Sequence, residues 1–216
     1  MRTGGIILCG GKSSRMGYSK ATLPFGPETM LARVLRLLGE VVDPLVVVAA
    51  RDQELPGLPA RVLVARDDNP DRGPLEGLRV GLSRLADSAD AAYATSCDVP
   101  LLVPDFVRRM IELLDECDAA VPVEEGQHHP LAAVYRTSVV SHIERLLGAD
   151  RRRPVFLFDE VPTRRVEVAE LRGVDPNLYT LTNLNRPDDY YAALRTAGFD
   201  PPPEIVKVLD SGGPAP

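Results

Sequence analysis

Residues 4–20 have the sequence GGIILCGGKSSRMGYSK, in which a short apolar run leads into a glycine-rich, basic loop. The apolar run, residues 5–9, predicts a buried β-strand at the start of an α/β fold. In the loop, Gly10 and Gly11 allow the backbone to approach a ligand closely, and consecutive free N–H groups form a nest that binds anions. The segment therefore predicts a phosphate-binding loop after the first strand.

Three cations accompany these glycines: Lys12, Arg15 and Lys20. Their side chains add charge-assisted hydrogen bonds that suit a polyphosphate. The glycine spacing fits neither a Walker loop nor Gly-x-Gly-x-x-Gly, which argues against a dinucleotide-dependent oxidoreductase. The alternative is an ordinary glycine turn, common after the first strand of α/β proteins; the cations favour phosphate binding.

Composition limits the class of protein. The chain has 216 residues, 44% of them hydrophobic, and a net charge of −6. We expect one domain over residues 1–199 and a proline- and glycine-rich tail over residues 200–216, poorly ordered apart from a local contact by residues 205–209. The acidic balance argues against general binding of nucleic acid or of anionic membranes. The basic first loop is therefore a local feature that suits a small anionic ligand.

The three cysteines, Cys9, Cys97 and Cys117, form no Cys-x-x-Cys pair. Sparse cysteines in apolar contexts predict reduced thiols and a cytoplasmic protein. We expect no signal peptide, because the first strand begins almost at the N-terminus. We also expect no membrane span, because the apolar runs are too short.

Strand-like and helix-like segments alternate along the chain. Strands are expected at residues 5–9, 45–50, 61–64, 91–95, 119–122, 130–135 and 164–168, and helices at residues 30–38, 74–85, 104–114, 138–147 and 187–197. Residues 153–158 fit either type. The alternation predicts a mostly parallel sheet flanked by helices, with ligands at the carboxyl ends of the strands. The loops after Cys9, Val64 and Thr95 should therefore share one edge of the sheet.

Asp98 comes at the carboxyl end of a predicted strand. A carboxylate at that place can bind Mg²⁺ that bridges phosphates. The alternative is a helix N-cap or a turn former, and the glycine loop favours the metal. Asn183 and Asn185 alternate as in a strand, so their amides face the same way. One could cap the helix that begins at Pro187, and the other could help to hold the metal or a phosphate.

Two further motifs allow two interpretations each. Gly73 and Gly77 would permit close approach to a base or ribose, or they belong to an ordinary turn with a proline-started helix. Asp67 could accept a hydrogen bond from guanine or ribose, or act as a solvated turn carboxylate. His129, beside His128, could contact an acceptor substrate or lie solvated in a loop. The lack of a cysteine or carboxylate at ligand spacing argues against a zinc site.

These pieces together resemble the molybdenum cofactor guanylyltransferases of the nucleotidyltransferase superfamily. The matching segments are LCGGKSSRMG at residues 8–17 with Lys20, GPLEGL at 73–78, CDVP at 97–100, HPL at 129–131 and NLNRP at 183–187. They follow the family's order from Gly4 to about Leu194. The resemblance implies a Rossmann-like, three-layer α/β/α fold of the nucleotide-diphospho-sugar transferase type, whose mostly parallel sheet has a small antiparallel part.

The resemblance also implies an activity, the transfer of GMP from GTP to the terminal phosphate of molybdopterin with release of pyrophosphate. Mg²⁺ would be the cofactor, and molybdoenzymes or proteins of the cofactor pathway would be protein partners. The implied nucleotide contacts are Leu8, Cys9, Gly10, Gly11, Lys20, Asp67 and Asp98. Asp98 would also bind Mg²⁺, and Arg15 and Lys20 would neutralise charge that grows on the phosphates.

The chain departs from the family at two positions. Ser19 precedes Lys20, where the family often has Asp, and Ala50 ends the second predicted strand, where the guanylyl enzymes commonly have Asn. Because that Asn helps to recognise the nucleoside, cytidylyl transfer to molybdopterin stays open, as does another phosphorylated acceptor. A non-catalytic nucleotide-binding module is the other alternative, against which Asp98 and Asn185 argue.

Overall fold

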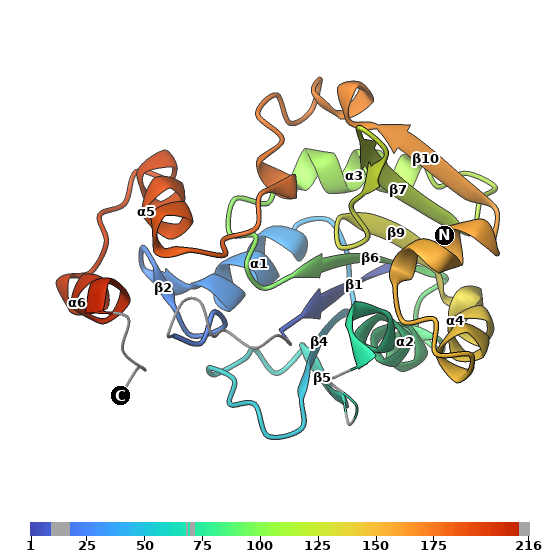
Figure 1. Cartoon of the computed structure of the whole chain (residues 1–216), viewed down its shortest axis with the longest axis horizontal. Helices are drawn as coiled ribbons and strands as arrows, with labels where there is room; N and C mark the ends of the chain where they lie inside the picture. Colours follow the sequence, from blue (N-terminus) through green and yellow to red (C-terminus); the bar gives the residue numbers. More distant parts are fainter. Residues whose placement is uncertain (10–17, 68, 70–71, 212–216) are drawn as a thin grey trace.

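The computed structural model describes residues 1–9, 18–67, 69 and 72–211, and its centre is a mostly parallel β-sheet (Figure 1). The strands are β1 (Thr3–Leu8), β4 (Leu45–Ala50), β5 (Leu63–Asp67), β6 (Ala91–Ser96), β7 (Ala119–Glu124), β8 (Gln127–His128), β9 (Ala133–Arg136) and β10 (Thr163–Glu167). Their order is β10-β7-β9-β6-β1-β4-β5, with β8 paired to β7. Only β9 and β8 run antiparallel to their neighbours among these described strands, which confirms the expected small antiparallel part.

Helices cover both faces of the sheet. The α-helices are α1 (Met30–Leu38), α2 (Pro74–Leu85), α3 (Pro104–Glu112), α4 (Val140–Gly148), α5 (Pro187–Thr196) and α6 (Pro203–Ser211), and the 3₁₀ helices are η2 (Thr137–Val139), η3 (Pro154–Asp159), η4 (Val168–Leu171) and η5 (Tyr179–Leu181). Successive residues of the central strand face opposite layers. Ile7 packs with α1 and α3, whereas Ile6 packs with α2 and α4. The expected three-layer α/β/α fold is therefore confirmed.

A third apolar cluster lies beside the sheet, where α5 and α6 pack against a small hairpin of β2 (Pro24–Phe25) and β3 (Glu28–Thr29) (Figure 1). Ile205 and Leu209 of α6 are buried there. The expected local contact of the tail is therefore confirmed, but the expectation of poor order is wrong for residues 203–211. Ile205 and Leu209 are spaced i, i+4, which places both on one helical face that covers the hairpin.

The structure corrects the bounds of two expected strands and defines two further segments. The strand expected at residues 61–64 lies at Leu63–Asp67, where its pairing with β4 places it. The strand expected from residue 130 begins at Ala133, because Pro130 has no N–H to donate to a ladder. Residues 153–158, which fitted either a helix or a strand, lie in η3, and the β2–β3 hairpin was not expected.

Among the described residues, no helix is long and apolar enough to cross a membrane.

Helix α2 lies unusually close to β1, and glycines make that approach possible. A Cβ atom on Gly81 would lie 2.7 Å from Cγ2 of Ile6, and one on Gly77 would lie 3.2 Å from Cδ1 of Leu8. The two glycines therefore serve as contact points between helix and strand. Their close packing fixes the N-terminal end of α2 beside the carboxyl end of β1.

Gly81→Ala should lower the free energy of unfolding by about 1–3 kcal/mol, because the new methyl group overpacks against a buried, β-branched side chain. Urea-induced unfolding followed by circular dichroism measures the change. Gly148→Ala is the matched control, since nothing lies within 4 Å of its Cβ position at the end of α4. The control substitution should leave the free energy of unfolding unchanged or raise it. An equal rise of that free energy in both variants would contradict the packing argument.

Candidate functional site

The candidate site lies where the chain changes direction across the sheet. From β1 the chain adds β4 and β5 on one side, and α2 then returns it to β6 on the other side. Leu8 and Ser96 are register partners at the carboxyl ends, where Cys97 N donates to Leu8 O at 3.1 Å. Open α/β sheets bind ligands at such a switch point.

Part of the predicted phosphate loop lies outside the described part of the chain. This holds for Gly10, Gly11, Lys12 and Arg15, whose roles remain predictions.

Asp98 is the centre of a polar cluster at this switch point. Its Oδ2 accepts a hydrogen bond from Lys20 Nζ at 2.7 Å, and its Oδ1 accepts one from Asn183 Nδ2 at 2.9 Å and another from the Ser96 hydroxyl. Lys20 Nζ also donates to Asn185 Oδ1 at 2.9 Å. The structure thus brings together Lys20, Asp98, Asn183 and Asn185. It adds Ser96, which the sequence analysis missed.

Buried hydrogen bonds hold the two asparagines in place. Leu184 N donates to Asp98 O at 3.0 Å, which fixes the segment between them against the end of β6. Upstream, the buried Asp175 carboxylate accepts hydrogen bonds from Tyr179 N and Thr180 N. This pairing fixes the turn that leads into the segment.

Neither asparagine side chain caps α5. Asp189 Oδ2 accepts from the backbone N–H groups of Asn185 and Arg186, both at 2.9 Å. The expectation that one of the amide side chains caps this helix is therefore wrong, because an acidic residue of its first turn accepts these N–H groups instead. Asp189 serves the first helical turn, and both amides are left to the Asp98 cluster.

The cluster offers oxygen ligands to a cation. Asp98 Oδ2 and Asn185 Oδ1 converge on one ammonium group, at 2.7 and 2.9 Å from Lys20 Nζ. Carboxylate and amide oxygens are ligands of hard divalent cations such as Mg²⁺. Within the described residues no three His, Cys, Asp or Glu side chains group as metal ligands. A cation here would take its other ligands from phosphate oxygens and water, which is how Mg²⁺ is commonly held with nucleotides.

The neighbouring thiols are poor candidates for nucleophiles. Cys9 and Cys97 are both buried. A hydrogen bond to Cys97 and burial raise the pKa of the Cys9 thiol well above its usual value. Only the thiolate is strongly nucleophilic, and a raised pKa keeps the Cys9 thiol protonated. The Cys9 side chain therefore contributes packing at this position.

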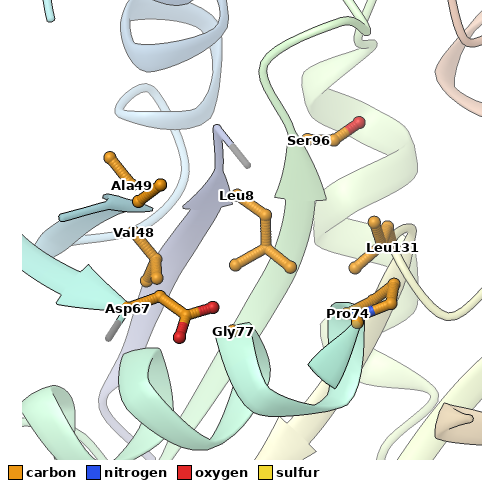
Figure 2. A pocket seen from close by; sticks show the side chains of 10 residues that line it. Leu8, Val48, Ala49, Asp67, Pro74, Gly77, Ser96 and Leu131 are labelled. Carbon is orange, nitrogen blue, oxygen red and sulfur yellow. The ribbon is translucent and has the colours of Figure 1, made fainter. Parts of the chain in front are cut away.

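Beside the cluster is a largely apolar cavity of about 200 Å³ (Figure 2). Its lining comes from the carboxyl ends of β1, β4, β5 and β6, from the start of α2 and from the loop before β9: Leu8, Val48, Ala49, Ala50, Asp67, Gly73, Pro74, Gly77, Ser96 and Leu131. The Asp67 carboxylate points from the end of β5 into the space between Leu8 and Gly77. Four predicted nucleotide contacts, Leu8, Asp67, Gly73 and Gly77, thus line one cavity.

Asp67 has a structural partner as well as a place in this cavity. It is buried, and its Oδ1 accepts a hydrogen bond from Asn69 N at 2.7 Å, which forms a turn. The solvated-carboxylate alternative is therefore wrong. The bond to the turn orients the carboxyl group, which still borders the cavity.

Gln53 is a second residue that the sequence analysis missed. Its Nε2 donates to Cys9 O at 2.9 Å, and its Oε1 accepts from Ala50 N at 3.3 Å. The amide therefore ties the ends of β1 and β4 together just before the glycine loop. No sequence signal identifies it, because Gln53 stands in an irregular segment.

His129 is not among the described residues that line this cavity. Its backbone N donates to Pro122 O at 2.9 Å, and burial lowers the pKa of its half-buried ring. Its Nε2 is buried without a hydrogen-bond partner among the described residues. The solvated-loop alternative does not describe such a ring, and its role as an acceptor contact remains a prediction.

Comparison with known proteins gives the following similarities. Residues 5–163 match the family model described as a MobA-like NTP transferase domain. A "Probable molybdenum cofactor guanylyltransferase" of Mycobacterium avium is 38% identical over 177 residues, which cover 80% of this chain and 88% of that protein.

Two solved structures share the fold. Molybdopterin-guanine dinucleotide biosynthesis protein A of Archaeoglobus fulgidus has a TM-score of 0.74 at 20% identity, covering 92% of this chain and 99% of its own. A Mycobacterium tuberculosis protein in complex with manganese has a TM-score of 0.61 at 19% identity, covering 91% of this chain and 100% of its own.

Lys20→Met should lower the free energy of unfolding by about 1–3 kcal/mol, because it leaves the mostly buried Asp98 carboxylate without its counter-charge. The double variant Lys20→Met/Asp98→Asn should recover part of this loss, since it removes the uncompensated charge. Urea-induced unfolding of both variants at neutral pH is the measurement. A double variant that is no more stable than Lys20→Met would show that the ion pair does not stabilise the fold.

Proposed function

Since this chain belongs to the MobA-like NTP transferase family and is a nucleotidyltransferase of molybdenum cofactor biosynthesis, we propose that it transfers GMP from GTP to molybdopterin and releases pyrophosphate. The observation that carries the proposal is the Asp98 cluster beside the apolar cavity at the switch point of the sheet. The cavity would take the guanosine, and the cluster would face the phosphates.

Base recognition would fall to Asp67. The Watson–Crick edge of guanine presents two neighbouring N–H donors, and a carboxylate accepts such a pair in a bidentate manner. Leu8 and Val48 offer apolar contact to the flat faces of the base. The small side chains of Ala49 and Ala50 leave room at this wall of the cavity.

Transfer needs no covalent intermediate with the enzyme. An oxygen of the acceptor phosphate attacks the α-phosphorus in line, a new P–O bond forms, and the bond to pyrophosphate breaks with its electron pair on the leaving group. A phosphate monoester, with a second pKa of about 6, is already a nucleophile at neutral pH. The chain therefore has to orient the two substrates and stabilise negative charge, which supplies much of the catalysis in such sites.

Lys20 and Asp98 would divide the electrostatic work. The Lys20 ammonium would donate hydrogen bonds to the phosphates as their charge grows in the transition state. Asp98 and Asn185 would hold Mg²⁺ through their oxygens, as their convergence on one cation supports. When bound, the ion supplies Lewis-acid polarisation of the α-phosphate. Asn183 and Ser96, which donate to Asp98 Oδ1, would keep the carboxylate in its orientation.

Asp98→Asn should lower the rate of pyrophosphate release from GTP, molybdopterin and Mg²⁺ by about 100-fold or more, because it removes the anionic ligand and keeps the shape of the side chain. Asp188→Asn is the matched control, since Asp188 is exposed in the first turn of α5. The control should retain the parental rate, and circular dichroism should show that both variants are folded. Release by Asp98→Asn at the parental rate would overturn the assigned role.

GTP should be preferred over ATP, CTP and UTP in the same assay with molybdopterin. Asp67→Asn should reduce this preference by about 10-fold, because an amide cannot accept both N–H groups of guanine. Preference of the parental protein for CTP would replace guanylyl by cytidylyl transfer, the alternative that Ala50 supports. Binding of nucleotides without pyrophosphate release, with any acceptor phosphate offered, would favour the non-catalytic module.

A further inference from the structure

The parallel ladder between β1 and β4 ends at a side chain. The register pairs Leu8 with Val48, and Cys9 N donates to Val48 O at 2.8 Å. In a parallel ladder the next hydrogen bond would run from Ala50 N to Cys9 O. Instead, Ala50 N donates to Gln53 Oε1 at 3.3 Å, and Gln53 Nε2 donates to Cys9 O at 2.9 Å. The Gln53 amide thus takes the place of one rung at the end of the ladder.

The turn that carries Gln53 is fixed from β5. Gln53 N donates to Ala50 O at 3.1 Å, which closes the turn after β4. Arg66 Nη1 donates to Ala50 O at 3.0 Å and to Gln53 O at 2.8 Å. Arg66 pairs in register with Ala49 and directly precedes Asp67. Two side chains therefore join the carboxyl ends of three strands, since Gln53 links β1 to β4 and Arg66 links β4 to β5.

These strand ends form a wall of the apolar cavity. Leu8, Ala49, Ala50 and Asp67 line it, and Figure 2 shows the Asp67 carboxylate pointing into the space beside Leu8. A direct rung between β1 and β4 would satisfy both backbone groups without any side chain, so the ladder itself does not require Gln53. The inserted amide instead spaces the two strand ends more widely and gives the Cys9 carbonyl a fixed direction.

We propose that Gln53, held in place by Arg66, is a positioning residue for the nucleotide and sets its affinity through Cys9 and Ala50. The inference rests on the proposed function, which assigns the nucleoside to this cavity. The Cys9 carbonyl belongs to a planar peptide unit, so the bond from Gln53 Nε2 fixes the direction in which the chain leaves β1. The bond from Ala50 N fixes the facing end of β4. Neither effect requires contact between Gln53 and the nucleotide.

Nucleotide affinity is the first test, measured by isothermal titration calorimetry with each of the four NTPs and Mg²⁺ in the absence of an acceptor. Gln53→Met keeps the length of the side chain and removes both of its amide hydrogen bonds. It should therefore raise the Kd of the tightest-binding NTP about 10-fold.

A double-mutant cycle tests the part of Arg66. Arg66→Met should also raise this Kd, because it releases the turn that carries Gln53. The double variant Gln53→Met/Arg66→Met should bind no more weakly than Gln53→Met alone, since both changes act through the same amide. Effects that multiply in the double variant would show that Arg66 acts independently and would overturn its assigned role.

Two exposed residues provide matched controls. Glu54→Met places the same side chain at the next position of the same segment, and Arg61→Met removes an exposed cation shortly before β5. Both variants should bind the NTP like the parental protein. In steady-state assays, Gln53→Met should raise the KM for the NTP about 10-fold and leave the KM for molybdopterin unchanged. An equal rise of both KM values would indicate a general structural role for Gln53 and overturn the inference.

The outcomes separate this inference from the proposed function. Unchanged NTP affinity of Gln53→Met, in a protein that still transfers GMP to molybdopterin, would overturn the role of Gln53 and leave the function standing. A 10-fold loss of affinity in Gln53→Met, when the parental protein binds an NTP but transfers no nucleotide to molybdopterin, would support that role and overturn the function. Binding of none of the four NTPs by the parental protein would overturn both.

Discussion

A carboxylate held away from bulk water must be compensated, and in this protein the compensation of Asp98 organises the site. The Asp98 side chain is only 12% exposed. Apart from its near neighbour Ser96 at the end of β6, its partners come from two distant parts of the sequence: Lys20 after β1 and Asn183 before α5. Leaving such a charge unpaired would be costly, so these segments must meet. One electrostatic constraint therefore places the groups that would bind metal and phosphate at the same edge of the sheet.

Around that constraint the chain separates two kinds of surface. Among the described lining residues, the cavity at β1, β4 and β5 is largely apolar with a single carboxylate, whereas a neighbouring cavity that shares Gly73 and Pro74 with it has three arginines. The start of α2 forms their common border, and the close contacts of Gly77 and Gly81 with β1 fix that border. The position of α2 thus sets the spacing of the two cavities, which links the packing of the helix to the shape of this edge of the sheet.

The sequence predicts those parts of the structure whose causes are local. The bounds of α1, β4 and α2 agree with the prediction, because Thr29 caps α1, Pro74 starts α2, and β4 is a continuous apolar run. The β2–β3 hairpin and α6 were not predicted. Both depend on an apolar cluster that brings Phe25 and Ile205 together although they are far apart in the sequence. In the site, the strand-end rule and the family resemblance grouped Asp98 with Asn183 and Asn185. The direct pairing of Lys20 with Asp98 and the bridge made by Gln53 depend on three-dimensional packing, which no local pattern encodes.

The placement of Asn183 and Asn185 has a consequence for synthesis on the ribosome. The central strand β1 is made first, but the amide partners of Asp98 and Lys20 lie more than 160 residues after it. A nascent chain can therefore build most of the sheet while its polar centre is still incomplete. The Asp98 cluster, on this view, is completed only once the chain has been made through Asn185, well after the last strand of the sheet.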